Sequence, residues 1–231
     1  MNIIKSIKDL SRTQRFLWMA SLFCIGVSFA VTKSNDYLTV LASLVGATAL
    51  IFVGKGDAVG QFLTIIFALL YAIISFECRY YGEMITYLGM TLPSALVAMV
   101  NWLRHPYSER EVKVSRLTKK IWFLLLISSV FVTVILGFVL EYFGTANMLF
   151  STISITTSYL ASMLTILRSP YYAVAYALND IVLIILWILA TIGNVNYLPM
   201  IICFLVFLVN DIYGFTNWQI MERRQKNRNG E

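Results

Sequence analysis

The sequence predicts an all-α membrane protein with eight transmembrane helices, and three observations support this fold class. Of the 231 residues, 59% are hydrophobic and only 13% are charged, whereas a soluble domain keeps about a quarter of its residues charged. Eight apolar runs come close to the roughly 20 residues that a helix needs to cross the hydrocarbon core of a bilayer. The basic residues gather in alternate gaps between these runs. Together the three observations exclude a soluble globular domain.

The eight predicted spans follow one another with mostly short connections. They are residues 16–31, 37–53, 59–76, 81–102, 121–140, 146–167, 172–192 and 197–218. Helices are predicted because a backbone inside lipid has to satisfy its own hydrogen bonds, and the sequence has no alternating strands of about ten residues. The predicted units are an N-terminal segment with an extra helix (1–35), a first three-helix repeat (36–103), a basic loop with a linker helix (104–145), a second three-helix repeat (146–220) and a basic tail (221–231).

The distribution of lysine and arginine predicts the orientation of the chain. With both termini in the cytoplasm, 16 of the 18 basic residues lie inside, and only Lys33 and Arg79 lie outside. Because short cytoplasmic loops of membrane proteins carry the excess of Lys and Arg, this split supports eight spans with cytoplasmic termini. The net charge of +6 therefore reflects topology, and we expect no nucleic-acid partner.

Motifs for catalysis and for metal binding are absent from the sequence. There is one histidine, the three cysteines have no CxxC spacing, and no HExxH, GxSxG or phosphate-cradling glycine loop occurs. We therefore expect no catalytic residue, no metal and no cofactor. The enzymatic alternative is a pair of intramembrane aspartates, Asp180 and Asp211, that share a proton. Each follows an asparagine and lacks the glycine pattern of intramembrane aspartyl proteases.

An internal repeat is indicated when the sequence is shifted by 116 residues without a gap. This shift places identical residues on one another and the aromatic Tyr71 on Trp187; the identical pairs are Asn101 with Asn217, Trp102 with Trp218, Tyr81 with Tyr197 and Met84 with Met200. The two blocks of three helices are joined by one connecting helix, so they have the same orientation in the membrane. Parallel repeats related by an axis along the membrane normal are one plan of transporters, with the substrate near the midplane between the repeats.

Polar and aromatic side chains gather in the last two predicted spans. They are Tyr176, Asn179, Asp180, Trp187, Asn210, Asp211, Tyr213 and Asn217. Asn and Asp are costly inside hydrocarbon and usually face a bundle interior or a cavity on a transport path, whereas a receptor or scaffold gains nothing from them there. Amides and carboxylates bind hydroxyl groups, and aromatic faces bind flat or cationic rings. The set predicts a site for a polar, aromatic solute such as a nucleoside or vitamin; the alternative is that these residues only hold helices together.

Other polar positions point less directly to a site. Ser151, Ser154 and Ser158 share one helix face, and small hydroxyl residues at that spacing favour close helix packing over solute binding. Pro93 predicts an irregular helix at the depth of the candidate site. For Gln61, a side chain that reaches toward the membrane surface is favoured over one that lines an exit path.

Three segments resemble the PnuC family of nicotinamide riboside transporters. They are 168–172 (RSPYY), 178–187 (LNDIVLIILW) and 210–218 (NDIYGFTNW), and residues 80–102 fit the first repeat. The resemblance implies a three-plus-one-plus-three fold similar to the SWEET sugar transporters and a homotrimer in the bacterial cytoplasmic membrane. It also implies facilitated diffusion of nicotinamide riboside, which a cytoplasmic kinase then traps by phosphorylation.

Two positions depart from the pattern of that family, and one of them is Phe67, which stands four residues before Tyr71 in the first repeat, where a polar residue is expected. Members that bind nicotinamide riboside resemble one another in a W-x-x-x-N pattern, and here Ala175 stands four residues before Asn179. Tyr176 or Trp187 would then supply the aromatic surface. Relatives in the same wider family carry thiamine, riboflavin or deoxyribonucleosides, so these remain alternative substrates.

Overall fold

The computed structural model describes residues 3–32, 36–109, 111–145, 147–193 and 197–229. Its elements are α1 (Ile3–Lys8), α2 (Arg12–Thr32), α3 (Tyr37–Lys55), α4 (Ala58–Glu77), α5 (Tyr81–Thr86), the π-helix η1 (Tyr87–Thr91), α6 (Leu92–Arg104), β1 (Pro106–Ser108), β2 (Glu111–Val112), α7 (Lys119–Tyr142), α8 (Met148–Ile166), α9 (Tyr172–Gly193) and α10 (Leu198–Asn229). Within these ranges eight helical segments are long and apolar enough to cross a membrane, with α5, η1 and α6 forming one of them. The predicted all-α fold with eight spans is confirmed.

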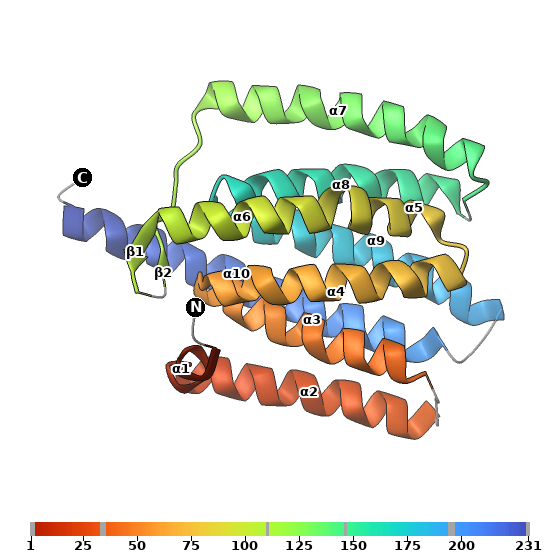
Figure 1. Ribbon diagram of the computed structural model, residues 1–231, viewed down its shortest axis with the longest axis horizontal. Helices are drawn as coiled ribbons and strands as arrows, with labels where there is room; N and C mark the ends of the chain where they lie inside the picture. Colours follow the sequence, from red (N-terminus) through yellow and green to blue (C-terminus); the bar gives the residue numbers. More distant parts are fainter. Residues whose placement is uncertain (1–2, 33–35, 110, 146, 194–196, 230–231) are drawn as a thin grey trace.

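Each span runs antiparallel to the next, so that alternate connections lie at the same end of the bundle (Figure 1). We call the end with both chain termini and the two short strands the terminal end, and the opposite one the far end. The described Lys and Arg residues lie at the terminal end, except for Arg79 in the turn between α4 and α5. Lys33 and Arg110, which were also counted in the charge split, lie outside the described residues.

Six of the spans close into a ring. α3 packs against α4, α4 against α6, α6 against α8, α8 against α9, α9 against α10, and α10 returns to α3. The other two spans lie outside this ring, with α2 against α3 and α10 and with α7 against α8 (Figure 1). The extra N-terminal helix and the linker helix of the sequence analysis are therefore the two peripheral helices, and the two three-helix blocks build the ring.

Local side-chain signals set the helix boundaries at the terminal end. Asp57 caps α4 by accepting a hydrogen bond from the backbone N–H of Val59 at 3.1 Å, and Thr118 caps α7. Gly56 ends α3 at a φ of 80°, where a Cβ would lie only 2.6 Å from Met221 Cε. Because glycine adopts this left-handed conformation without strain and Asp57 satisfies a free N–H at once, the turn between α3 and α4 takes only two residues.

The irregularity that was predicted near Pro93 takes the form of a π-helix. η1 (Tyr87–Thr91) directly precedes α6, and Pro93 is the second residue of α6. The wider π-helical turn inserts an extra residue into the span and is frequent at functional sites. It leaves Tyr87 and Thr91 buried inside the bundle.

Both halves of the ring use the same hydrogen bonds at the terminal end. In each half an Asn-Trp pair on the third helix donates to backbone carbonyls at the end of the first helix of the other half. The bonds join Asn101 to Ile166 O (2.6 Å), Trp102 to Thr165 O (3.0 Å), Asn217 to Gly54 O (2.8 Å) and Trp218 to Val53 O (2.9 Å). The halves are therefore interlocked in a reciprocal way, as the two copies in a two-fold arrangement are.

Two aromatic pairs locate the axis between the halves. Trp187 Nε1 donates to Tyr71 Oη at 2.9 Å, and the rings of Trp102 and Trp218 are 5.3 Å apart. The members of each pair are separated by the 116 residues of the repeat. Two residues exchanged by a two-fold axis can touch only if they lie beside that axis. Because one pair lies toward each end of the bundle, these contacts support an axis along the bundle and the interpretation as parallel repeats.

The repeat is not free of gaps, contrary to the sequence alignment. The acceptor residues Thr165 and Val53 are 112 residues apart, whereas the donors Trp102 and Trp218 are 116 apart. Three of these four residues come from the turn between the first and second helices, which has five residues (167–171) in one half and two (56–57) in the other. The difference of four residues equals about one helical turn.

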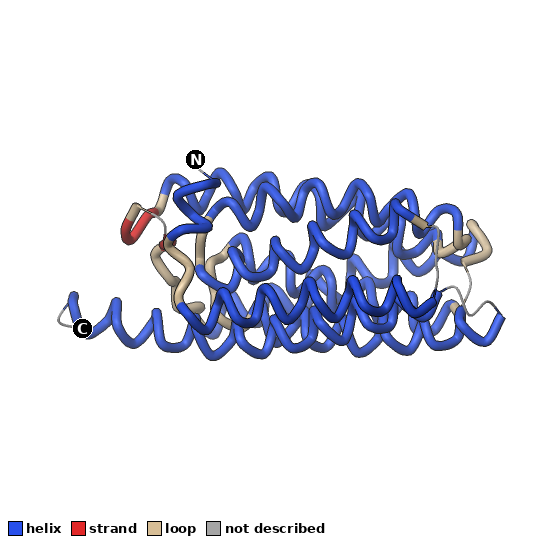
Figure 2. The backbone as a smooth tube through the Cα atoms, turned by 90° about the horizontal axis from the view of Figure 1, so that it is seen from below, coloured by secondary structure: helices blue, strands red, loops and turns tan. Residues whose placement is uncertain are grey.

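Several predicted boundaries also change. The first span begins at Arg12 rather than at residue 16, and the basic tail is a continuation of α10 that extends beyond the other helices (Figure 2). The predicted start of the sixth span at Ala146 lies outside the described residues, and α8 begins at Met148.

The predicted basic loop contains the short hairpin β1–β2 and binds this extension of α10. Gln225 Nε2 donates to Glu111 Oε1 and to Val112 O, each at 3.0 Å, and Gln225 Oε1 accepts from the N–H of Val114 at 2.9 Å. Arg224 forms an ion pair with Glu111. We call the described residues of this loop, 105–109 and 111–118, the strap, and the contacts with Gln225 and Arg224 hold it at the terminal end.

Candidate functional site

A narrow cavity lies inside the ring of six spans, between the two aromatic pairs. Its volume is about 50 Å³, and we call it the central cavity. The lining residues are Gly46, Ala49, Leu50 and Val53 of α3, Gln61, Thr64 and Phe67 of α4, Tyr87 and Thr91 of η1, Tyr176, Asn179 and Asp180 of α9, and Phe207 and Asp211 of α10. Five of the six spans therefore line it, and the polar side chains at its wall come mainly from α4 and α9.

Asn179 is held in place by α8. Its Oδ1 accepts hydrogen bonds from Ser154 Oγ at 3.1 Å and from Thr157 Oγ1 at 2.8 Å. These two bonds occupy the carbonyl side of the amide, so the NH₂ group is the part of Asn179 that can donate to a solute. The serine face of α8, for which packing was favoured, therefore also orients a residue of the cavity wall.

Asp180 and Asp211 face each other across the junction of α9 and α10. Both side chains are buried, and their carboxyl groups lie within hydrogen-bonding reach of each other. Among the described residues, Asp180 Oδ2 has no hydrogen-bond partner. The pair can accept hydrogen bonds from a solute or balance its positive charge.

Aromatic rings form the remaining wall of the cavity. Phe67 stacks on Tyr71 with ring centroids 5.5 Å apart, and its edge contacts with Tyr87 and Phe207 have centroid distances of 5.8 and 5.4 Å. Gly46 makes this arrangement possible, because a Cβ at that position would lie 2.4 Å from Phe207 Cζ. A flat or cationic ring would find aromatic faces and edges here.

Of the eight site residues predicted from the sequence, the structure brings four together at the central cavity. These are Tyr176, Asn179, Asp180 and Asp211. Trp187, Asn210, Tyr213 and Asn217 do not line it. The eight residues therefore do not all line one cavity, and each of the other four has its own set of contacts.

Asn210 and Tyr213 face the peripheral helix α2. Asn210 Nδ2 donates to Ser21 Oγ at 3.0 Å and to Val206 O at 2.8 Å. Tyr213 is half-buried, and its hydroxyl group lies near Gln14 of α2. Both side chains therefore join α10 to α2, the role that the packing alternative assigned to such residues.

Asn217 and Trp187 belong to the two ends of the bundle. Asn217 donates to Gly54 O in the reciprocal bonds at the terminal end. Trp187 is fully buried and donates to Tyr71 Oη, so its polar atom is already occupied. Among the described aromatic residues, Phe67, Tyr87, Tyr176 and Phe207 line the central cavity, and Trp187 does not.

Several residues of the cavity wall were not predicted from the sequence. Gln61, which was expected to reach toward the membrane surface, is 2% exposed and lines the cavity. Thr64 could have been found, because the shift of 116 residues places it on Asp180. Phe67 and Tyr87 carry no such signal, since aromatic residues are common in apolar spans.

Aromatic side chains close the central cavity toward both ends. At the terminal end the rings of Trp218 and Tyr172 are 4.9 Å apart, next to Trp102. At the far end Tyr80 packs against Trp187 and donates to Leu186 O at 2.9 Å. Burial raises the pKa of Tyr80 to about 12, so its hydroxyl group keeps its proton at neutral pH and remains a donor. The structure is therefore closed on both sides of the cavity.

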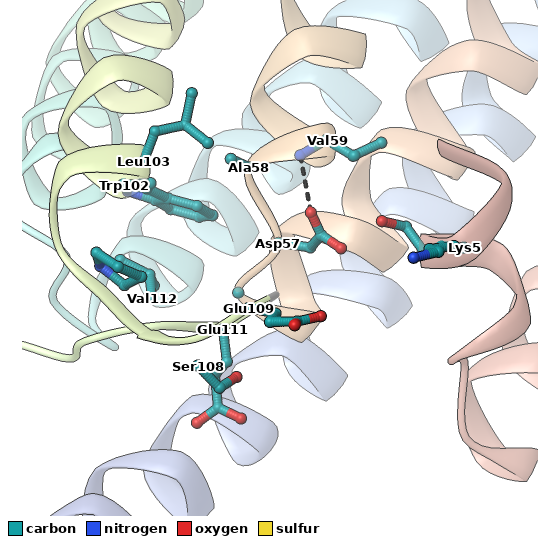
Figure 3. Close-up of a pocket in the computed structure, with 13 residues that line it drawn as sticks. Lys5, Asp57, Ala58, Val59, Trp102, Leu103, Ser108, Glu109, Glu111 and Val112 are labelled. Atoms are coloured by element: carbon teal, nitrogen blue, oxygen red, sulfur yellow. Dashed lines mark hydrogen bonds between the residues drawn. The ribbon is translucent and has the colours of Figure 1, made fainter. Parts of the chain in front are cut away.

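A larger pocket of about 460 Å³ lies at the terminal end (Figure 3). Figure 3 shows Asp57 with its bond to Val59 and, nearby, Glu109 of the strap. Trp102 lines this pocket and contacts Trp218, so the tryptophan pair separates it from the central cavity. None of the eight predicted site residues lines it.

Comparisons with known proteins agree with this architecture. The family described as nicotinamide mononucleotide transporter matches residues 36–220. The nicotinamide riboside transporter PnuC of Neisseria mucosa is 28% identical over 214 residues, which cover 90% of this chain and 81% of that protein. PnuC of Haemophilus influenzae is 24% identical over 212 residues and 90% of each chain.

A solved structure has the same fold. The crystal structure of the vitamin B3 transporter PnuC superimposes with a TM-score of 0.83 at 27% sequence identity, over 94% of each chain. The resemblance inferred from the sequence motifs is thereby confirmed. Since the family matches most of the chain, including all six spans of the ring, this protein belongs to the nicotinamide mononucleotide transporter family and is a multi-pass membrane transporter.

Proposed function

We propose that the chain carries nicotinamide riboside across the membrane by facilitated diffusion, with the solute held in the central cavity. The observation that carries this proposal is the position of the cavity. It lies on the axis between two interlocked halves, and Asn179, Asp180 and Asp211 face it at a depth where polar groups are costly. The relatives named above are nicotinamide riboside transporters, which supports the same solute for this chain.

The groups at the cavity match the two parts of this solute. Nicotinamide riboside joins a positively charged pyridinium ring to a ribose. The carboxyl groups of Asp180 and Asp211 can balance the charge of the ring, and Tyr176, Phe67 and Tyr87 offer aromatic surface to it. The NH₂ group of Asn179 can donate to the carboxamide oxygen of the ring or to a hydroxyl oxygen. Ala175, at the position of the family tryptophan, leaves the stacking role to these other aromatic residues.

The closed state of the structure fits a carrier that opens to one side at a time. The central cavity of about 50 Å³ is far smaller than the roughly 300–1,000 Å³ of ordinary small-molecule pockets. The solute therefore has to enter as the ring of helices widens. Rocking of one half against the other would separate the aromatic residues at one end while those at the other end stay in contact.

The orientation proposed for the carrier places the terminal end in the cytoplasm of a bacterial cell. The clustering of the described basic residues at that end supports this choice. In a cysteine-free variant, Ser108→Cys should be protected from an impermeant thiol reagent added to intact cells, and Glu77→Cys at the far end should react. Labelling of Ser108→Cys with protection of Glu77→Cys would reverse the orientation.

Transport by purified protein in liposomes tests the function. Labelled nicotinamide riboside should equilibrate across the bilayer in proteoliposomes and not in protein-free liposomes, and an imposed proton or sodium gradient should not concentrate it. A cytoplasmic kinase would then trap the solute in the cell. Thiamine, riboflavin and deoxyribonucleosides are tested in parallel. Exchange of one of these without exchange of nicotinamide riboside would refute the proposed substrate, and no exchange of any would refute the function.

The homotrimer implied by the family resemblance stays a prediction. The linker helix α7 exposes a broad apolar face, which includes Phe123, Ile127 and Phe131. In the membrane such a face contacts lipid or a neighbouring copy.

A further inference from the structure

Glu83 is a buried acidic residue that the sequence analysis did not single out and that the central cavity does not include. It lies in α5, one helical turn from Tyr87 of the cavity wall and closer to the far end. Glu83 is only 1% exposed. Among the described residues, neither of its carboxyl oxygens has a hydrogen-bond partner.

Polar groups lie around Glu83, and two of them form hydrogen bonds with other residues. Its carboxyl group is close enough to interact electrostatically with Tyr71, Tyr80 and Tyr87. The hydroxyl group of Tyr80 donates a hydrogen bond to Leu186 O, and the hydroxyl oxygen of Tyr71 accepts a hydrogen bond from Trp187 Nε1. Within the described part of the chain, no cationic side chain acts on the Glu83 carboxyl group.

Ser154 of α8 connects Glu83 to the site already described. α5 packs against α8, and Ser154 is the polar side chain that interacts with the Glu83 carboxyl group. A hydroxyl group has one proton to donate, and Ser154 donates it to Asn179 Oδ1. Among the described residues Glu83 is thus left without a donor, although Ser154 interacts both with its carboxyl group and with the amide of Asn179 at the central cavity.

A purely structural role does not account for this arrangement. A buried carboxyl group that stabilises a fold accepts hydrogen bonds or pairs with a cation, because otherwise its lost hydration is not compensated. Ionisable residues that are kept inside transmembrane bundles without such partners mark the path of a solute or ion. Glu83 lies one helical turn from Tyr87 of the cavity wall, on the side of the far end, where Tyr80 and Trp187 pack together.

We propose that Glu83 is a second solute-binding residue, which accepts hydrogen bonds from the sugar hydroxyl groups of a nucleoside-like solute on the far-end side of the central cavity. The proposal rests on the proposed function of the chain. A carboxylate has two oxygens and can accept from two neighbouring hydroxyl groups at once, as a ribose diol offers them. The ring of the solute would lie toward Asp180 and Asp211, and the ribose would extend between Asn179 and Glu83.

The test combines one variant with one change in the solute. Glu83→Gln keeps the size of the side chain and removes its charge. Glu77→Gln is the matched control, because Glu77 ends α4 at the same end of the bundle and is exposed. Calorimetry on the purified full chain in detergent measures the dissociation constants of nicotinamide riboside and of its 2′,3′-dideoxy analogue.

We expect Glu83→Gln to weaken the binding of nicotinamide riboside by about tenfold, as the loss of hydrogen bonds to a charged group does. Binding of the dideoxy analogue should stay within about twofold of the wild type, since it has no diol for Glu83 to bind. The Glu77→Gln control should change neither. An equal loss for both solutes, or no loss for either, would overturn the proposal.

The wild-type protein alone gives a second test that does not depend on the folding of a variant. It should bind nicotinamide riboside at least about tenfold more tightly than the dideoxy analogue. Equal affinity for both solutes would refute the role of Glu83 and leave the proposed function intact. Binding of neither solute would refute the proposed substrate, and the role of Glu83 with it.

Discussion

Asn179 and Asn210 allow one chemical change to be compared at two locations. Both are buried amides in the last two spans, and both were predicted to bind the solute. The structure places Asn179 at the central cavity and Asn210 against Ser21 of α2. We therefore expect Asn179→Ala to weaken solute binding with little effect on stability, and Asn210→Ala to lower stability with little effect on solute binding.

The expected magnitudes follow from the bonds that each variant loses. Asn179→Ala removes a donor to the solute, a loss of about 0.5–1.5 kcal/mol, or roughly 2- to 12-fold in the dissociation constant. The hydroxyl group of Thr157 keeps a backbone acceptor in the carbonyl of Ile153 at 3.1 Å, which limits the cost to the fold. Asn210→Ala removes the bond to Ser21 of α2 and the bond to Val206 O within α10. An interhelical bond such as the one to Ser21 contributes about 0.6–1.7 kcal/mol of stability in membrane proteins.

Calorimetry with nicotinamide riboside and thermal unfolding in detergent measure the two effects. Asn179→Ala should raise the dissociation constant and leave the midpoint of unfolding close to that of the wild type. Asn210→Ala should lower the midpoint by a few degrees and leave the dissociation constant unchanged. The reverse pattern, with weakened binding in Asn210→Ala alone, would show that the solute lies between α10 and α2 rather than in the central cavity.

Three further variants probe the cavity and the strap. Asp211→Asn should weaken the binding of cationic nicotinamide riboside by roughly tenfold more than that of its uncharged dihydro form, because a charge-assisted contact is worth about 1.5 kcal/mol more than a neutral one; equal losses in calorimetry would contradict this. Gly46→Ala should lower the rate of uptake into proteoliposomes, since its Cβ would lie 2.4 Å from Phe207 Cζ and such overpacking costs about 1–3 kcal/mol; an unchanged rate and melting temperature would count against the tight packing. Gln225→Ala should lower the melting temperature by breaking the strap contacts and leave the dissociation constant unchanged, so a change in affinity alone would contradict a purely structural strap.

The number of spans and their approximate bounds could be predicted because they depend on local composition. A bilayer requires apolar runs of about 20 residues whose backbone bonds are internal. Such runs can be read from the chain without knowing how the helices pack. The clustering of basic residues at one end follows from the same alternation of spans and loops. The correspondence of the two Asn-Trp pairs could also be predicted from the sequence. Their hydrogen bonds to the first helix of the other half could not.

Membership of the site could be predicted only in part. The sequence pointed to α9 and α10, and the structure places four of the eight predicted residues at the central cavity. It gave no signal for Phe67 or Tyr87, because aromatic residues are common in apolar spans, and it favoured the membrane surface over the cavity wall for Gln61. The insertion that offsets the two repeats in the sequence could also be found only from the structure. The longer turn after α8 shifts the numbering of α8 by about one helical turn relative to α3.

Asn210 and Asp211 show why the tertiary structure had to decide the rest. They are neighbours in the sequence with similar polarity, so composition and depth treat them alike. In a helix, successive residues point about 100° apart. Asn210 therefore faces Ser21 on the peripheral helix, and Asp211 faces Asp180 and the cavity. The sequence alone determined that polar groups lie deep in the membrane, whereas the rotation of each helix within the ring determined which of them a solute can reach.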